Sequence, residues 1–162
     1  MQSEQETELE EQIVETWAIH QRIHLYLLEA LSEEALQAAP ASKGRNVYAL
    51  FAHIHNVRLM WLKSAAPDLL EGLEKLETGV VAVKAQLEAA LEGSGKAIET
   101  LLRQSLESGG KIKGFKPHAA AFLGYMISHE SHHRGQIEWA LKQAGQPLPD
   151  RISYGLWEWG VR

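Results

Sequence analysis

The sequence of 162 residues predicts an all-α protein, a single four-helix bundle domain over residues 1–162. Apolar residues recur at helical spacing in four long stretches, and no stretch alternates apolar and polar residues for long enough to indicate a sheet. Proline and glycine punctuate the segments between these stretches, where they mark connections. Four long helices joined by short and long connections are typical of a four-helix bundle.

The four helices are expected at residues 4–31, 46–64, 80–108 and 117–144. In the first helix, one seam runs at alternating spacings of four and three through Ile13, Trp17, His20, His24, Leu27 and Leu31. Asn46 is expected to cap the second helix, and Pro117 suits the first turn of the fourth. Val80 and Val83 are expected on the inward face of the third helix. The aromatic residues after the fourth helix are expected to pack over one end of the bundle.

Composition excludes several classes of function. The formal net charge is −5 and no block of basic residues is present, so binding to nucleic acid through a basic patch is not expected. The absence of cysteine excludes a disulfide framework, a zinc–thiolate site and a cysteine nucleophile, and it fits a cytoplasmic location. No apolar run approaches the roughly 18 residues needed to cross a bilayer, and the acidic N-terminal segment is unlike a signal peptide, so no membrane association is expected.

Three of the eight histidines lie in the stretch HESHHRGQ, residues 129–136. His129 and His133 occupy the seam that also carries Phe122 and Met126, so both are predicted to face the bundle interior. Residues four apart lie one turn apart on one face, the spacing that lets two imidazoles bind one metal ion in HExxH helices. In the second helix, His53 lies on the flank of the apolar stripe and is the better candidate for a third ligand.

Three imidazoles from two helices form a recurring metal arrangement that leaves a position for water or substrate. The alternative is a set of ordinary core histidines held by protein hydrogen bonds. Two unpartnered imidazoles in a core cost several kcal/mol, and a shared metal removes that cost. Zinc or nickel is expected first, and iron or manganese second. His20 and Glu130 are candidates for a catalytic role, while the roles of His24, His55 and His132 stay open.

Several segments resemble the DinB/YfiT-like family of metal-dependent helical bundles. The segment HESHHRGQIEWALKQAGQPLP resembles its last-helix motif, HxxxHRGQ, and NVYALFAHIHNVRLMWL resembles its second-helix motif. The resemblance implies a metal triad of His53, His129 and His133. It also implies a homodimer. His20 stands where relatives commonly have Asn. Within the motif, Arg134 is placed to pair with Glu130 at i+4, and Gly135 is expected to permit close helix approach.

The resemblance also implies a thiol-dependent S-transferase, because some relatives use low-molecular-weight thiols such as bacillithiol, mycothiol or glutathione. In this interpretation the partners are a small-molecule thiol and an electrophilic small molecule. A chain without cysteine suits such a mechanism, since the cosubstrate brings the nucleophile. The alternatives are a metal-dependent hydrolase with Glu130 or His20 as general base, a non-catalytic metal-binding stress protein, and a bundle whose histidines bind nothing.

Overall fold

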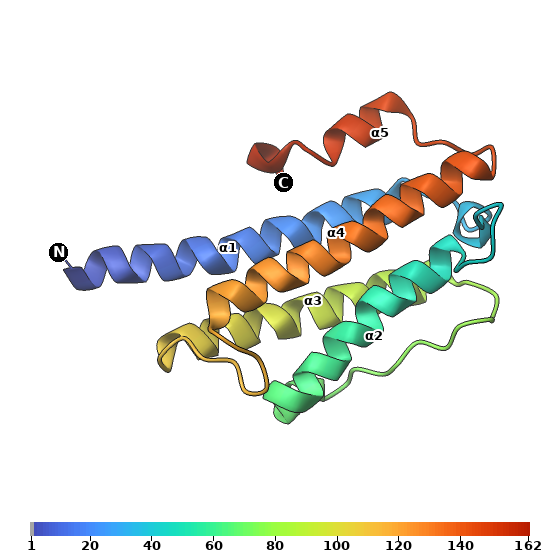
Figure 1. Cartoon of the computed structure of the whole chain (residues 1–162). Helices are drawn as coiled ribbons and strands as arrows, with labels where there is room; N and C mark the ends of the chain where they lie inside the picture. Colours follow the sequence, from blue (N-terminus) through green and yellow to red (C-terminus); the bar gives the residue numbers. More distant parts are fainter. Residues whose placement is uncertain (1) are drawn as a thin grey trace.

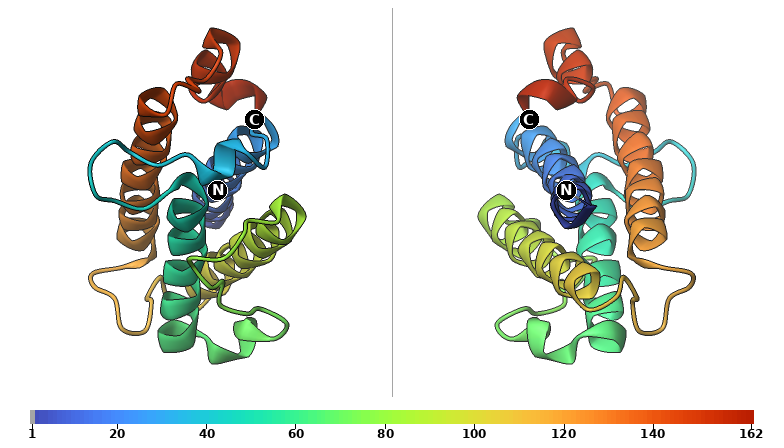
Figure 2. Two further views of the ribbon diagram at one scale, coloured as in Figure 1. Left: turned by 90° about the vertical axis from the view of Figure 1, so that its right-hand side faces the viewer. Right: turned by 90° about the vertical axis from the view of Figure 1, so that its left-hand side faces the viewer.

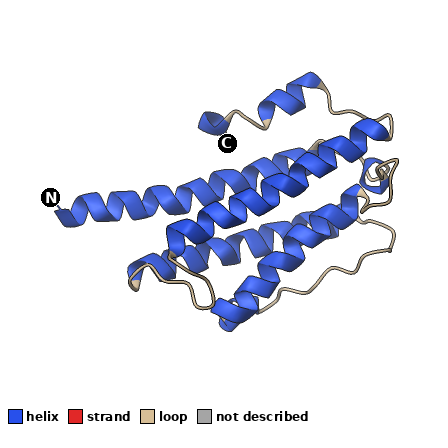
Figure 3. Ribbon diagram, viewed as in Figure 1, coloured by secondary structure: helices blue, strands red, loops and turns tan. Residues whose placement is uncertain are grey.

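The computed structural model describes the backbone of residues 2–162 and the side chains of residue 5 and residues 7–162. The prediction of an all-α bundle is confirmed: four long helices make up most of the described chain, and no strand occurs in it (Figures 1 and 3). The long helices are α1 (Gln2–Glu29), α2 (Val47–Ala65), α3 (Lys84–Glu107) and α4 (Ala119–Gln143). The short elements are η1 (Ala35–Gln37), η2 (Pro67–Leu70), α5 (Asp150–Gly155) and η3 (Trp159–Val161). Within residues 2–162, no helix is both long enough and apolar enough to span a membrane.

The helices pack so that α1 and α2 each contact both α3 and α4. Seen along the bundle, the order around it is therefore α1, α3, α2, α4 (Figure 2). A long connection, residues 66–83, runs back along the bundle and lets α2 and α3 lie in the same direction (Figure 1). The antiparallel pair α2 and α4 carries the predicted metal ligands, so the candidate site lies between two adjacent helices.

The apolar core is divided into two clusters along the bundle. Between them lies a polar layer, to which each long helix contributes: it consists of His20, His24, Arg58, Ser94 and Glu130, and every member is fully buried. Buried polar groups need hydrogen-bond partners, so this layer fixes how the four helices align along the bundle axis.

One helix start agrees with the sequence-based expectation and another differs from it. Asn46 caps α2 as predicted, with its side chain accepting from the backbone N–H of Ala49. The placement of Pro117 in the first turn of α4 is wrong, because α4 begins at Ala119 and His118 is its cap. The exposed imidazole of His118 accepts from a backbone N–H there, as asparagine does in α2.

The inward placement of Val80 and Val83 is also wrong. Both side chains are exposed, because α3 begins only at Lys84 and the preceding residues form an extended connection. Gly79 has a φ of +80°, a left-handed backbone that does not continue into a helix. Apolar residues in this segment therefore do not mark a helix face.

The C-terminal segment covers the side of the bundle near α1, not only one end of it (Figure 1). Arg162 stacks over the ring of Tyr26 at 3.7 Å, and Leu156 is buried. The expectation that the tail aromatics pack inward is wrong for Tyr154 and Trp157, which are largely exposed, whereas Trp159 packs against the core.

Gly95 of α3 permits a close approach to α1. Its carbonyl accepts from Trp17 Nε1 at 2.8 Å, and an added Cβ would overlap the amide of Gln21. We expect Gly95→Ala to lower the free energy of unfolding by about 1–3 kcal/mol, because Gln21 is buried and its amide donates to the carbonyl of Leu91.

Urea denaturation of the Gly95 variant measures this effect. Gly124→Ala in α4 is the matched control, since no atom lies within 4 Å of the added Cβ. That control should gain up to about 1 kcal/mol from helix propensity. Equal gains in both variants would show that the α1–α3 contact is not tight at Gly95.

Candidate metal centre

The structure brings His53 of α2 together with His129 and His133 of α4. Their ligand-capable ring nitrogens all lie within 4.8 Å of one another. The ring of His53 lies 4.5 Å from that of His133 and 5.4 Å from that of His129, measured between centroids. These three residues, the histidine triad, are the set that the sequence singled out as ligands.

The α4 pair is oriented for a shared ligand. The Nε2 atoms of His129 and His133 lie 3.1 Å apart. Nδ1 of His133 is 2.8 Å from Gln136 Oε1, and donation of its proton to that oxygen makes Nε2 an acceptor, which can take a hydrogen bond from His129 Nε2 or bind a metal in its place. His129 Nδ1 is buried, and no described residue forms a hydrogen bond with it. The donor set therefore fits a divalent cation held by three neutral imidazoles.

The triad is held in the neutral form that metal binding requires. Burial, followed by the nearby charges of His133, Arg45 and His129, lowers the pKa of His53 to about 4. Burial is also the main cause that lowers the pKa of His129 and of His133. At neutral pH a metal therefore does not have to displace protons from these rings.

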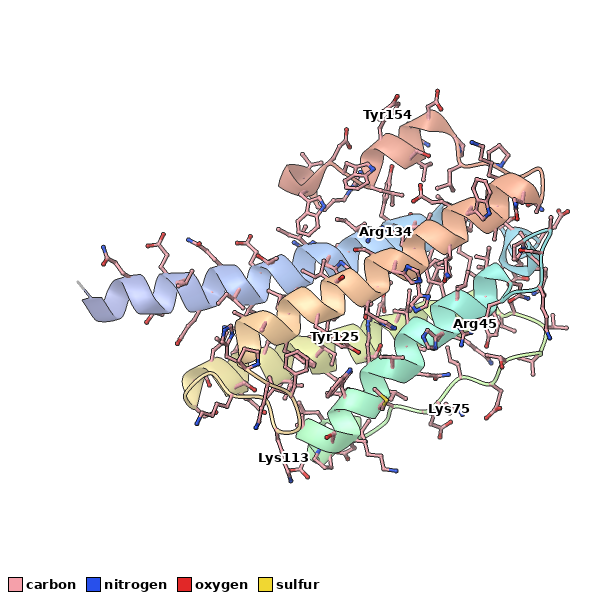
Figure 4. All side chains as sticks on the ribbon, viewed as in Figure 1. Arg45, Lys75, Lys113, Tyr125, Arg134 and Tyr154 are labelled. Carbon is pink, nitrogen blue, oxygen red and sulfur yellow. The ribbon has the colours of Figure 1, made fainter. Side chains whose placement is uncertain are left out.

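The triad is accessible on one side. His53 and His129 are only partly buried, whereas His133 is buried. Tyr125 lies on the same helix as His129 (Figure 4). Its ring is nearly parallel to that of His129, with centroids 6.2 Å apart. Tyr125 also contacts Trp61 and Phe115, so the loop before α4 covers an aromatic cluster next to the triad.

Glu130 points into the polar layer and not into an open cleft. Its carboxylate accepts from Arg58 through Nε at 2.6 Å and Nη2 at 2.8 Å. His20 Nε2 lies 2.8 Å from the same carboxylate. Arg58 also donates to the carbonyl of Leu91 and stacks over Trp17 at 5.0 Å. The network ties α1, α2, α3 and α4 together through one buried ion pair.

This geometry favours a positioning role for Glu130 and His20 over proton transfer. Burial alone would raise the pKa of Glu130, but the charge and hydrogen bonds of Arg58, with the hydrogen bond to His20, hold it well below its usual range. A carboxylate with such a low pKa is a poor proton acceptor. The ion pair with Arg58 fixes the rotation of α4 about its axis. Because His129 is adjacent to Glu130, this ion pair also fixes the direction in which His129 leaves the helix.

His20, His24 and Glu130 form a second group that could hold a metal by distance. The Arg58 guanidinium already occupies both carboxylate oxygens, and a divalent cation there would be repelled by it. His24 Nε2 is 3.9 Å from the carboxylate and Nδ1 lies 3.0 Å from the carbonyl of His20. Among the described residues, no ion pair with Arg or Lys is formed by the histidine triad, which is therefore the better candidate for a metal site.

The remaining histidines have separate places. His55, whose role the sequence left open, is buried, and its Nε2 lies 2.8 Å from the carbonyl of Glu74. His24 is likewise fully buried, whereas His132 is exposed beside the triad.

Two motif residues also differ from expectation. Glu130 is paired with Arg58, whereas Arg134 Nη2 donates to Ser131 at 3.4 Å, so the proposed i+4 pair is wrong. Gly135 is exposed with nothing near an added Cβ, so it does not serve close helix approach.

Sequence reasoning did not assign roles to Arg58, Ser94 and Gln136. Arg58 lies inside an apolar helix, and Ser94 interrupts the apolar seam of α3, both of which are signals of a buried polar layer. Gln136 follows His133 by three residues, the spacing at which side chains on a helix meet. These signals indicate that a buried polar side chain needs a hydrogen-bond partner, but they do not identify the residue that provides it.

The hydrogen bond from Gln136 leads to a prediction about metal affinity. We expect Gln136→Ala to weaken metal binding by about 10–100-fold, because His133 loses the acceptor that fixes its tautomer. Competition with a chromophoric chelator measures the change, and Gln136→Glu, which keeps an acceptor, is the matched control. Unchanged affinity in Gln136→Ala would mean that the bond does not orient the ligand.

Fold and site together define an all-helical bundle protein with a three-histidine group that could hold a divalent metal. The model of the DinB family matches residues 1–157, and the chain belongs to that family. The resemblance seen in the sequence is thereby confirmed over nearly the whole chain. Searches of curated proteins and of solved structures returned no match.

Proposed function

We propose that this DinB-family protein is a metal-dependent thiol S-transferase that joins a low-molecular-weight thiol to an electrophilic carbon. The observation that carries the proposal is the histidine triad, in which His53 and His129 are partly exposed and one ring nitrogen of each residue lies within 4.8 Å of the others. Zinc or nickel is the proposed metal, because imidazole ligands suit both. A bound divalent cation would supply Lewis acidity that favours the thiolate form of a thiol.

The chain contributes ligands, orientation and shielding. His53, His129 and His133 would hold the cation, and Gln136 fixes the ring of His133. Tyr125 and the aromatic cluster around it lie on one side of the triad. The chain has no cysteine, so the sulfur nucleophile has to come from a cosubstrate.

The reaction balances without an oxidant or reductant. The thiol gives its proton to solvent, its sulfur forms the new S–C bond, and the electrophile's leaving group departs with the electron pair of the broken bond. With monochlorobimane as the electrophile, the leaving group is chloride and the product is fluorescent.

The test uses protein purified without a histidine tag, loaded with zinc or nickel. Conjugation of monochlorobimane should exceed the buffer rate only when a thiol such as glutathione is present, and it should disappear after metal removal by a chelator. His132→Ala should keep the activity, and His133→Ala should lose it. Equal rates with and without metal would contradict the proposal, as would cleavage of esters without thiol in place of conjugation.

A further inference from the structure

A pocket of about 330 Å³ lies at the N-terminal end of α2. The connection before α2 lines it, including Lys43 and Arg45, together with Gln136 and Trp139 of α4. Gln136 is the residue bonded to His133, so the pocket and the triad share a wall. Figure 4 labels Arg45 near the start of α2.

The charge of the pocket is positive. Its lining includes two basic side chains and no acidic one. Within the described part of the chain, neither Lys43 nor Arg45 forms an ion pair. Arg45 lines the same pocket as Gln136, whose side chain is bonded to His133 of the triad. A metal held by three neutral imidazoles would add further positive charge.

The pocket is built rather than incidental. Ala41 N donates to Gln143 Oε1 at 2.9 Å and Val47 N donates to the carbonyl of Ala38 at 2.9 Å, so both ends of the connection are fixed. The indole of Trp139, 56% exposed, and the buried Leu50 add apolar surface beside the two cations. A small molecule with a carboxylate and a short apolar stem matches this lining.

We propose that this pocket recognises the carboxylate of an anionic thiol cosubstrate, with Arg45 as the main charged contact and Lys43 beside it. The inference rests on the proposed transferase function and names the substrate class of that site. It makes Arg45 a specificity-determining residue that favours carboxylate-bearing thiols over neutral thiols of the same size.

The test measures binding to the Co(II)-loaded protein through the sulfur-to-cobalt charge-transfer band. The probes are 3-mercaptopropionate and the neutral 3-mercapto-1-propanol. Arg45→Gln should weaken binding of the carboxylate thiol by about 10-fold or more, because a charge-assisted hydrogen bond is lost. Binding of the neutral thiol should change by less than about 2-fold, as should both affinities in the control Lys63→Gln at the other end of α2.

Each other outcome is decisive. If Arg45→Gln weakens both thiols equally, or neither, the carboxylate is not recognised by Arg45 and the inference is overturned. If neither thiol produces a charge-transfer band in the Co(II)-loaded protein, thiolate binding at the triad fails, and the proposed transferase function falls with the inference.

Discussion

His133→Ala is expected to lower metal affinity by well over 100-fold, more than the loss of a hydrogen-bond partner of a ligand causes. His133 lies at the centre of the triad: its Nε2 is 3.1 Å from that of His129, and its ring is the nearer of the two to His53. With two imidazoles left, the site no longer provides the three protein ligands of an open metal centre. Elemental analysis of tag-free protein and chelator competition measure the loss.

The adjacent His132 provides the control, because His132→Ala and His133→Ala each replace one histidine of the same helix by alanine. His132 is exposed and is not a member of the triad, so His132→Ala should bind metal as tightly as the wild type. Equal metal loss in the two variants would indicate that metal binds at the helix surface and not at the triad. Equal retention would indicate that His133 is an ordinary core residue.

Arg58→Met is expected to lower the free energy of unfolding at pH 7 by about 3–5 kcal/mol, because it leaves the Glu130 carboxylate buried without a cation. Arg58 is fully buried and donates to both carboxylate oxygens. The exposed Lys63 on the same helix is the matched control, and Lys63→Met should change stability by less than about 0.5 kcal/mol. Urea denaturation followed by circular dichroism measures both.

The pH dependence separates this explanation from a simple packing defect. In the wild type the pKa of Glu130 is held well below the unfolded value, so its contribution to stability is present above about pH 4.5 and is lost as the pH falls. In Arg58→Met, the Arg58 charge no longer counteracts the effect of burial, which raises the pKa of Glu130. Protonation of Glu130 at lower pH should therefore restore part of the free energy of unfolding that the variant has lost relative to the wild type. A deficit of the same size at pH 7 and pH 5 would contradict a role for the buried charge.

The fold and the grouping of the triad could be predicted because both follow from the spacing of residues within individual helices. The seam through Phe122 and Met126 oriented His129 and His133, and the stripe of α2 oriented His53. The same reasoning wrongly placed Val80 and Val83 on the inward face of a helix. Apolar character does not reveal the backbone conformation, and the backbone is left-handed at Gly79.

The polar layer could not be predicted because it depends on contacts between helices. Arg58 meets Glu130 across 72 positions of sequence, and no local pattern identifies such a partner. The same holds for the basic pocket, where a connection folds back against Gln136 and Trp139 of α4. Periodicity gives the face on which a residue lies, whereas tertiary packing decides what it meets there.

Anomalous diffraction from crystals of zinc- or cobalt-loaded protein tests the metal centre most directly. We predict one strong peak about 2.0–2.1 Å from a ring nitrogen of each of His53, His129 and His133. A peak between His20, His24 and Glu130, or no peak within the bundle, would contradict the assignment of the triad as the metal site.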